Sequence, residues 1–178
     1  MHRTARFACS LAAVVAGLVG CSGSPAQKPE PGTANTSVPP LPTSSVATDD
    51  RLAVETAYRE FWNRLDRVPT LDESQWRSTL TEVAADPQLT ITLDALGQQK
   101  RSGITGYGTE TARILSVDVS GQSATVKDCQ DASQSGQADA KTGKPKTVGV
   151  PRNPIAASLI RTDGGWKVSQ ITYPGGTC

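Results

Sequence analysis

Six prolines within residues 22–48 confine the folded part of this 178-residue chain to the residues after them. Ser, Thr and Gly fill most of the gaps between these prolines, and no apolar pattern repeats there. Such a segment buries too little apolar surface to offset the entropy lost on ordering it, so we expect a disordered tether. From Asp49 the composition becomes that of a globular protein. Residues 49–178 are therefore predicted to form a single domain around one hydrophobic core.

The first 20 residues have the three-part pattern of a bacterial export signal. His2, Arg3 and Arg6 form a basic start, and residues 7–19 are almost wholly apolar. The apolar run is too short to span a bilayer core of ~30 Å, which requires about 20 helical residues. Its length and flanks are typical of a signal peptide, which we expect to occupy residues 1–20.

The signal ends in Leu18-Val19-Gly20-Cys21, which resembles a bacterial lipobox. That resemblance implies a diacylglyceryl group on the Cys21 sulfur and a mature chain that begins at Cys21. Two or more acyl chains make a stable anchor. We therefore expect a lipoprotein held on the extracytoplasmic face of the cell membrane, with residues 21–48 as lipidated Cys and tether. The alternative is an ordinary cleavage site with a chance cysteine.

Three helices are predicted in the first half of the domain. The first has an apolar stripe at helical spacing, made of Val54, Tyr58, Phe61, Leu65 and Val68. Asp49 or Asp50 is expected to cap its start, and Pro69 to end it. A second helix is predicted over residues 73–85, and Asp86-Pro87 is typical of the start of a third, short helix.

Two strand–turn–strand patterns occupy the second half. Residues 112–119 and 123–131 flank the turn Ser120-Gly121-Gln122, and residues 155–162 and 166–173 flank Asp163-Gly164-Gly165. The glycine-rich residues 103–108 are expected to be a flexible segment that leads into the first of these strands. Helices followed by long antiparallel strands predict an α+β fold, with N-terminal helices packed on a curved antiparallel sheet.

Two sequence segments carry a family resemblance. Residues 57–62 (AYREFW) on the opening helix and residues 163–168 (DGGWKV) before a closing strand resemble the cone-shaped superfamily of nuclear transport factor two. Ketosteroid isomerase shares that fold. More narrowly, the chain resembles small actinobacterial lipoproteins that carry this domain behind a Pro/Ser/Thr linker. The resemblance implies a conical pocket between helices and sheet, but no particular activity, because enzymes, carriers and interaction modules share the shape.

Several kinds of chemistry are excluded from the expected mature chain. The only histidine is His2, which leaves with the expected signal peptide. The mature chain would therefore have no histidine for a Ser-His-Asp site or for a zinc site with imidazole ligands. Residues 103–108 lack the spacing of a dinucleotide-binding fingerprint. Residues 49–178 contain fifteen Lys and Arg and sixteen Asp and Glu, so no basic surface dominates. We expect no metal, no cofactor and no nucleic-acid partner.

Cys129 and Cys178 remain after Cys9 leaves with the signal and Cys21 is lipidated. Two cysteines far apart in the sequence of an exported protein predict a disulfide rather than a metal or redox pair. An intermolecular bridge is the competing interpretation.

Carboxylate chemistry survives these exclusions. A site like that of ketosteroid isomerase needs an Asp base and acidic hydrogen-bond donors in an apolar pocket. Tyr58 is a possible donor, and Asp118, Asp128 or Asp131 a possible carboxylate. Tyr58 also lies on the apolar stripe of its helix, where a core tyrosine is expected, so we expect no enzyme.

Two non-catalytic hypotheses remain. The preferred one is an interaction or scaffold module at the cell surface, because no converging set of polar residues is visible. The alternative is a binder of a small apolar ligand, with Tyr58 and Trp62 lining the cone. A pocket of ~300 Å³ or more favours ligand binding, whereas an exposed apolar patch favours a protein partner.

Overall fold

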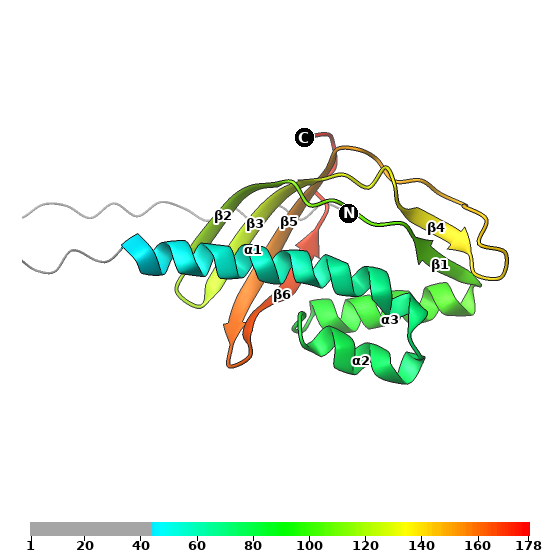
Figure 1. Cartoon of the computed structure of the whole chain (residues 1–178), viewed down its shortest axis with the longest axis horizontal. Helices are drawn as coiled ribbons and strands as arrows, with labels where there is room; N and C mark the ends of the chain where they lie inside the picture. Colours follow the sequence, from blue (N-terminus) through cyan, green and yellow to red (C-terminus); the bar gives the residue numbers. More distant parts are fainter. Residues whose placement is uncertain (1–43) are drawn as a thin grey trace, which may run out of the picture. The chain divides into compact units, whose positions relative to one another are not determined.

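Residues 44–178 are the part of the chain that the computed structural model describes. They form three α-helices, a four-stranded antiparallel sheet and a two-stranded one (Figure 1). The predicted signal peptide, Cys21 and the tether up to residue 43 lie outside these residues. Within residues 44–178 no helix is both long and apolar enough to cross a bilayer.

Helix α1 (Ser44–Arg67) lies across the four-stranded sheet (Figure 1). It starts before Asp49, so the prediction that Asp49 or Asp50 caps it is wrong. No proline lies between Ser44 and Arg67, so every residue of the helix has the backbone N–H that a helical hydrogen bond requires. Asp50 instead forms an ion pair with Arg161. The helix ends as predicted ahead of Pro69, which lies in a single 3₁₀ turn, η1 (Val68–Thr70).

Helix α2 (Glu73–Thr81) ends earlier than predicted. The residues after it pair with strand β6 (Gly165–Thr172) instead of continuing the helix. The backbone N–H of Val168 donates to Val83 O, and the N–H of Ala85 donates to Val168 O, both at 2.9 Å. Helix α3 (Gln88–Arg101) follows Asp86-Pro87 as predicted, but is a full-length helix rather than a short one.

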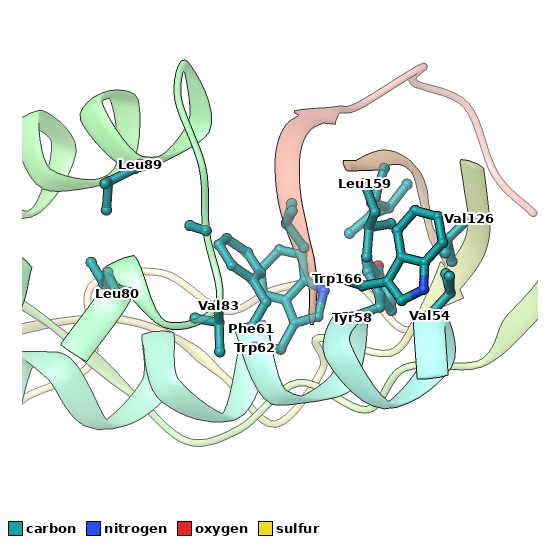
Figure 2. Packing of buried hydrophobic residues seen from close by; sticks show 14 of the residues in the cluster. Val54, Tyr58, Phe61, Trp62, Leu80, Val83, Leu89, Val126, Leu159 and Trp166 are labelled. Atoms are coloured by element: carbon teal, nitrogen blue, oxygen red, sulfur yellow. The ribbon is translucent and has the colours of Figure 1, made fainter. Parts of the chain in front are cut away.

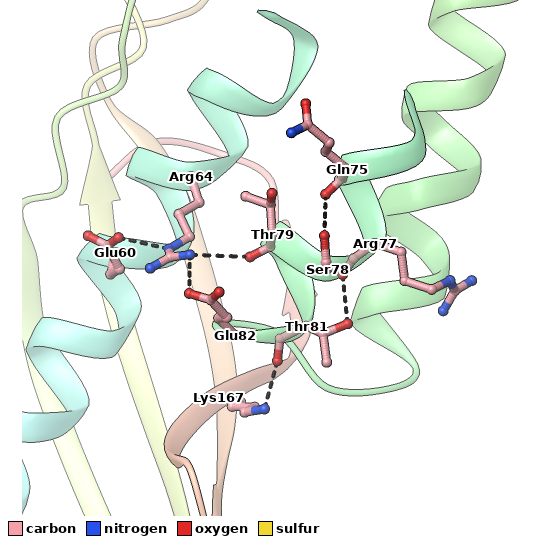
Figure 3. A network of polar contacts seen from close by, with 9 residues as sticks. All are labelled: Glu60, Arg64, Gln75, Arg77, Ser78, Thr79, Thr81, Glu82 and Lys167. Atoms are coloured by element: carbon pink, nitrogen blue, oxygen red, sulfur yellow. Dashed lines mark hydrogen bonds and ion pairs between the residues drawn. The ribbon is translucent and has the colours of Figure 1, made fainter. Parts of the chain in front are cut away.

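A group of polar contacts ties α2 to α1 and β6 (Figure 3). The guanidinium of Arg64 on α1 donates to Glu60 Oε1 at 2.9 Å and pairs with Glu82, just after α2. Lys167 Nζ on β6 donates to Thr81 O at 2.6 Å. The end of α2 is thereby held from two sides.

The four-stranded sheet has the order β2-β3-β5-β6, all antiparallel. Its other strands are β2 (Ile114–Ser120), β3 (Ser123–Gln130) and β5 (Asn153–Thr162). Both predicted hairpins are confirmed, with the strand ends displaced by a residue or two. Helices packed on one face of this sheet make the fold α+β, as predicted.

A second, two-stranded sheet was not expected. Strand β1 (Ile104–Tyr107) pairs with β4 (Gly136–Asp139), so the prediction of a flexible segment at residues 103–108 is wrong. Two glycines at this pair permit neighbouring backbone segments to approach closely. A Cβ on Gly108 would lie 1.9 Å from Gln134 O, and one on Gly136 would lie 2.3 Å from Thr147 O.

The hydrophobic core lies between α1 and the inner face of the sheet (Figure 2). Helix α1 contributes Val54, Tyr58 and Phe61 from its predicted stripe, and Trp62 next to it. Facing strands contribute Val126, Leu159, Trp166 and Val168, and all eight side chains are buried. The apolar side chains on one face of the strands therefore pack against the apolar stripe of the helix, as the sequence predicts.

The predicted disulfide between Cys129 and Cys178 is confirmed. It joins the end of β3 to the last residue of the chain, 49 positions away. Arg152 also donates a hydrogen bond to Cys178 O. These contacts fix the segment after β6, whose first residue, Tyr173, reaches a cavity beside the core.

Candidate ligand-binding cavity

A cavity of about 490 Å³ opens beside the core, between the end of α1, helix α3, the β1–β4 pair and the end of β6. Its apolar walls are Leu65, Pro69, Ile91, Leu96 and Ile171. Cavities of this volume are typical of small-molecule sites, which combine apolar walls with a few polar groups. It also exceeds the ~300 Å³ that separates the two non-catalytic hypotheses.

A bulge in β6 places Ile171 of that strand, and Tyr173 just after the strand, in the lining of the cavity. Leu159 of β5 pairs with Val168, but the preceding Ser158 pairs with Gln170, so Ser169 has no partner in the register. One extra residue reverses the alternation of side chains along the strand. Ile171 consequently lies on the cavity side, and Tyr173 follows it there.

Helix α3 supplies the opposite wall through polar side chains that are already paired. Gln88 Oε1 accepts a hydrogen bond from the N–H of Ile171 at 2.8 Å, and Gln88 Nε2 donates to Thr92 Oγ1 at 3.1 Å. Gln88 and Thr92 are both buried. The polar atoms of this wall therefore already have hydrogen-bond partners within the protein, as buried polar groups require. Ile91, one turn along, is 55% exposed at the rim.

Two carboxyl groups meet in the lining of the cavity. Asp66 comes from the last turn of α1, and Glu110 from the loop between β1 and β2. Burial, together with the hydrogen bond and the charge of Glu110, raises the pKa of Asp66 to about 7. Glu110 Oε1 accepts a hydrogen bond from Ser135 Oγ at 2.9 Å. Asp66 can therefore keep its proton until close to neutral pH.

The predicted ligand-lining residues, Tyr58 and Trp62, lie elsewhere. Both are in the closed core and neither lines this cavity, because the stripe that carries them packs directly on the sheet. The cavity begins one turn further along α1, at Leu65 and Asp66. Tyr58 and Trp62 therefore share helix α1 with Leu65 and Asp66 but lie outside the cavity.

Among the candidate catalytic residues, the structure brings only Tyr58 and Asp128 together. Tyr58 Oη donates to Asp128 Oδ2 at 2.9 Å, and Asp128 Oδ1 accepts from the N–H of Arg113 at 2.6 Å. Burial raises the pKa of both side chains above their ordinary values. Both side chains are buried, so the pair links α1 to β3 and to the residue just before β2 inside the core.

The other two candidate carboxylates are apart from this pair. Asp118 is exposed on β2. Asp131, just after β3, accepts hydrogen bonds from Ser133 Oγ and N–H, which hold its pKa below the usual range, and it pairs with Arg113. Among residues 44–178 no group of three His, Cys, Asp or Glu side chains is placed to hold a metal ion.

Comparisons with known proteins identify no family. No protein-family model matches the chain, and no curated protein matches it. Solved structures with distant likeness include the intermembrane-space region of the chloroplast protein ARC6, at 15% identity and a TM-score of 0.43, covering 77% of this chain and 100% of that one. A conserved protein from Planctomyces limnophilus matches at 14% identity and a TM-score of 0.44, covering 70% of this chain and 94% of that one.

A phospholipid-binding protein from Ralstonia solanacearum, solved with a phospholipid, matches at 11% identity and a TM-score of 0.36. The match covers 71% of this chain and 79% of that one. Likenesses this distant carry no argument about function, which must come from the cavity itself.

Proposed function

We propose that this protein binds a small molecule with an apolar body in the cavity between α1, α3, the β1–β4 pair and β6. The observation that carries the proposal is the cavity's volume of about 490 Å³ together with its apolar walls. Burial of ligand carbon against such walls contributes roughly 25 cal/mol per Å² of apolar surface removed from water.

The distribution of exposed apolar side chains favours this proposal over a scaffold module. Seven large apolar residues are exposed in the described part of the chain, and they are spread over several elements. Two of them, Ile91 and Tyr173, line the cavity, where a bound ligand would cover them.

We propose further that the domain performs this role while anchored to the membrane through a lipid on Cys21. The basic and apolar segments ahead of Leu18-Val19-Gly20-Cys21 support this assignment. A tethered binding domain would keep its ligand near the membrane's extracytoplasmic face. Catalysis is not part of the proposal, because the one candidate Tyr–Asp pair, Tyr58 and Asp128, is enclosed in the core.

Native mass spectrometry of the full chain, purified from the cell that makes it, tests the proposal. We expect an adduct of constant mass, distinct from every detergent used, on the wild-type protein. Ala95 lines the cavity, so Ala95→Phe should remove the adduct by filling the space. The adjacent Asp94 is exposed and outside the lining, so Asp94→Phe is the matched control and should retain it. Retention by Ala95→Phe would place any ligand elsewhere and contradict the proposal.

A further inference from the structure

We infer that the cavity selects ligands that carry a cationic nitrogen at one end of the apolar body, with the nitrogen placed against Asp66 and Glu110. This inference rests on the proposed function and names the class of ligand for the same cavity.

The two acids of the cavity differ from the other half-buried acids in having no cationic partner within the described chain. Seven Asp and Glu residues of that part are half-buried. Five of them form an ion pair with Arg or Lys: Asp50, Glu55, Glu60, Asp131 and Asp139. Asp66 and Glu110 form none with any residue of 44–178, and they are the two that line the cavity. Elsewhere this domain neutralises its half-buried carboxylates, whereas at the cavity the neutralising charge is missing from the protein.

The lining as a whole also lacks positive charge. No Lys, Arg or His lies among the residues that line the cavity within the described chain. A low-dielectric wall strengthens the field of an uncompensated carboxylate. A cation is therefore attracted to this end of the cavity, and an anionic head such as a carboxylate or phosphate is repelled.

Two tyrosines belong to the same lining. Tyr107 lies on β1, and its hydroxyl donates to Thr147 O at 2.9 Å, which fixes the ring. Tyr173 lies at the rim after β6. The faces of aromatic rings attract ammonium groups, by about 0.5–2 kcal/mol depending on solvent exposure. Carboxylates and aromatic rings together suit an amine or quaternary ammonium better than a neutral polar head.

Protonation of Asp66 then couples to binding. Glu110 from the β1–β2 loop interacts directly with Asp66. The other titratable groups of the lining are Tyr107 from β1 and Tyr173 after β6, and α3 contributes only uncharged side chains to it. Because the pKa of Asp66 is raised to about 7, a bound cation must displace a proton below that pH. Affinity for a permanent cation should rise several-fold between pH 6 and pH 8.

Isothermal titration calorimetry of the full chain at pH 8 tests the inference with three probes of equal chain length. These are octyltrimethylammonium, 1-octanol and octanoate. We expect octyltrimethylammonium to bind at least tenfold more tightly than 1-octanol, and octanoate to bind most weakly. The double variant Asp66→Asn/Glu110→Gln should lose this preference while keeping its affinity for 1-octanol. Asp94→Asn, which removes an exposed charge from the neighbouring α3, is the matched control and should keep the preference.

The outcomes separate the two proposals. If 1-octanol or octanoate binds as tightly as the cation, the inference about ligand class is wrong and the binding function stands. A cation preference that survives in the double variant also overturns the inference. If none of the three probes binds the wild-type protein, the proposed function fails and the inference fails with it.

Discussion

Replacing Asp66 with asparagine should stabilise the protein at pH 8 and leave its stability nearly unchanged at pH 4. The folded protein raises the pKa of Asp66 from 3.8 to about 7, mainly by burial and then through Glu110. Between these values the folded state binds a proton that the unfolded state has released. The free energy of unfolding therefore falls as pH rises from about 4 to about 7, and stays low above pH 7.

The size of this effect depends on the same raised pKa. A difference of one in pKa between the folded and unfolded states is worth about 1.4 kcal/mol. The rise from 3.8 to about 7 therefore changes the free energy of unfolding by at most about 4 kcal/mol. Because Asp66 is only half-buried and solvent screens its charge, we expect about 1–2 kcal/mol. Asparagine has nearly the same shape and no charge, so Asp66→Asn should recover this amount at pH 8, where the wild-type carboxyl is ionised.

Urea unfolding at pH 4, 6 and 8 measures the effect, with tryptophan fluorescence as the signal. Trp62, Trp76 and Trp166 are all buried and report loss of the core. The exposed Asp94→Asn serves as the control, with equal stability changes expected at each pH. An Asp66→Asn variant that is less stable than wild type at pH 8, or shifted equally at all three pH values, would refute the reasoning.

Three further predictions concern the core, the disulfide and the anchor. Tyr58→Phe removes a donor to the buried Asp128 carboxyl, so it should cost about 1–3 kcal/mol by urea unfolding, and more at pH 8 than at pH 4, since that donor favours the ionised form. Cys178→Ser opens a loop of 49 positions and should cost about 4 kcal/mol in the chain-entropy model; two titratable thiols in the denatured, unreduced domain of residues 49–178, which lacks Cys9 and Cys21, would disprove the bridge. Cys21→Ala should abolish partitioning into the detergent phase of a two-phase extraction, and wild-type partitioning of that variant would rule out lipidation at Cys21.

The elements that the sequence predicts well are those with a repeating apolar pattern. The stripe from Val54 to Leu65 specifies one face of α1, and two hairpins are predicted from alternation and glycine-containing turns. The β1–β4 pair escapes prediction because it is short and glycine-rich, and its pairing joins segments far apart in the chain. The close backbone approaches of Gly108 to Gln134 and of Gly136 to Thr147, beside this pair, likewise appear only in three dimensions.

The site escapes prediction for related reasons. Asp66 directly follows Leu65 on α1, and nothing in the local pattern separates it from an ordinary surface acid. Its partner Glu110 lies in a loop whose position depends on β1, and the bulge at Ser169 decides that Ile171 faces the cavity. Tyr58 and Trp62 attract attention in the sequence because they are aromatic, but the same property makes them core residues.

Isotope-filtered nuclear Overhauser spectroscopy of the full chain with octyltrimethylammonium tests most directly whether the cavity is a ligand site. We predict contacts from the alkyl chain to the methyl groups of Leu65, Ile91 and Ile171, which line the cavity. Contacts confined to Leu115 and Ile160, exposed residues outside the lining, would contradict the proposed site, as would the absence of any contact at saturating probe.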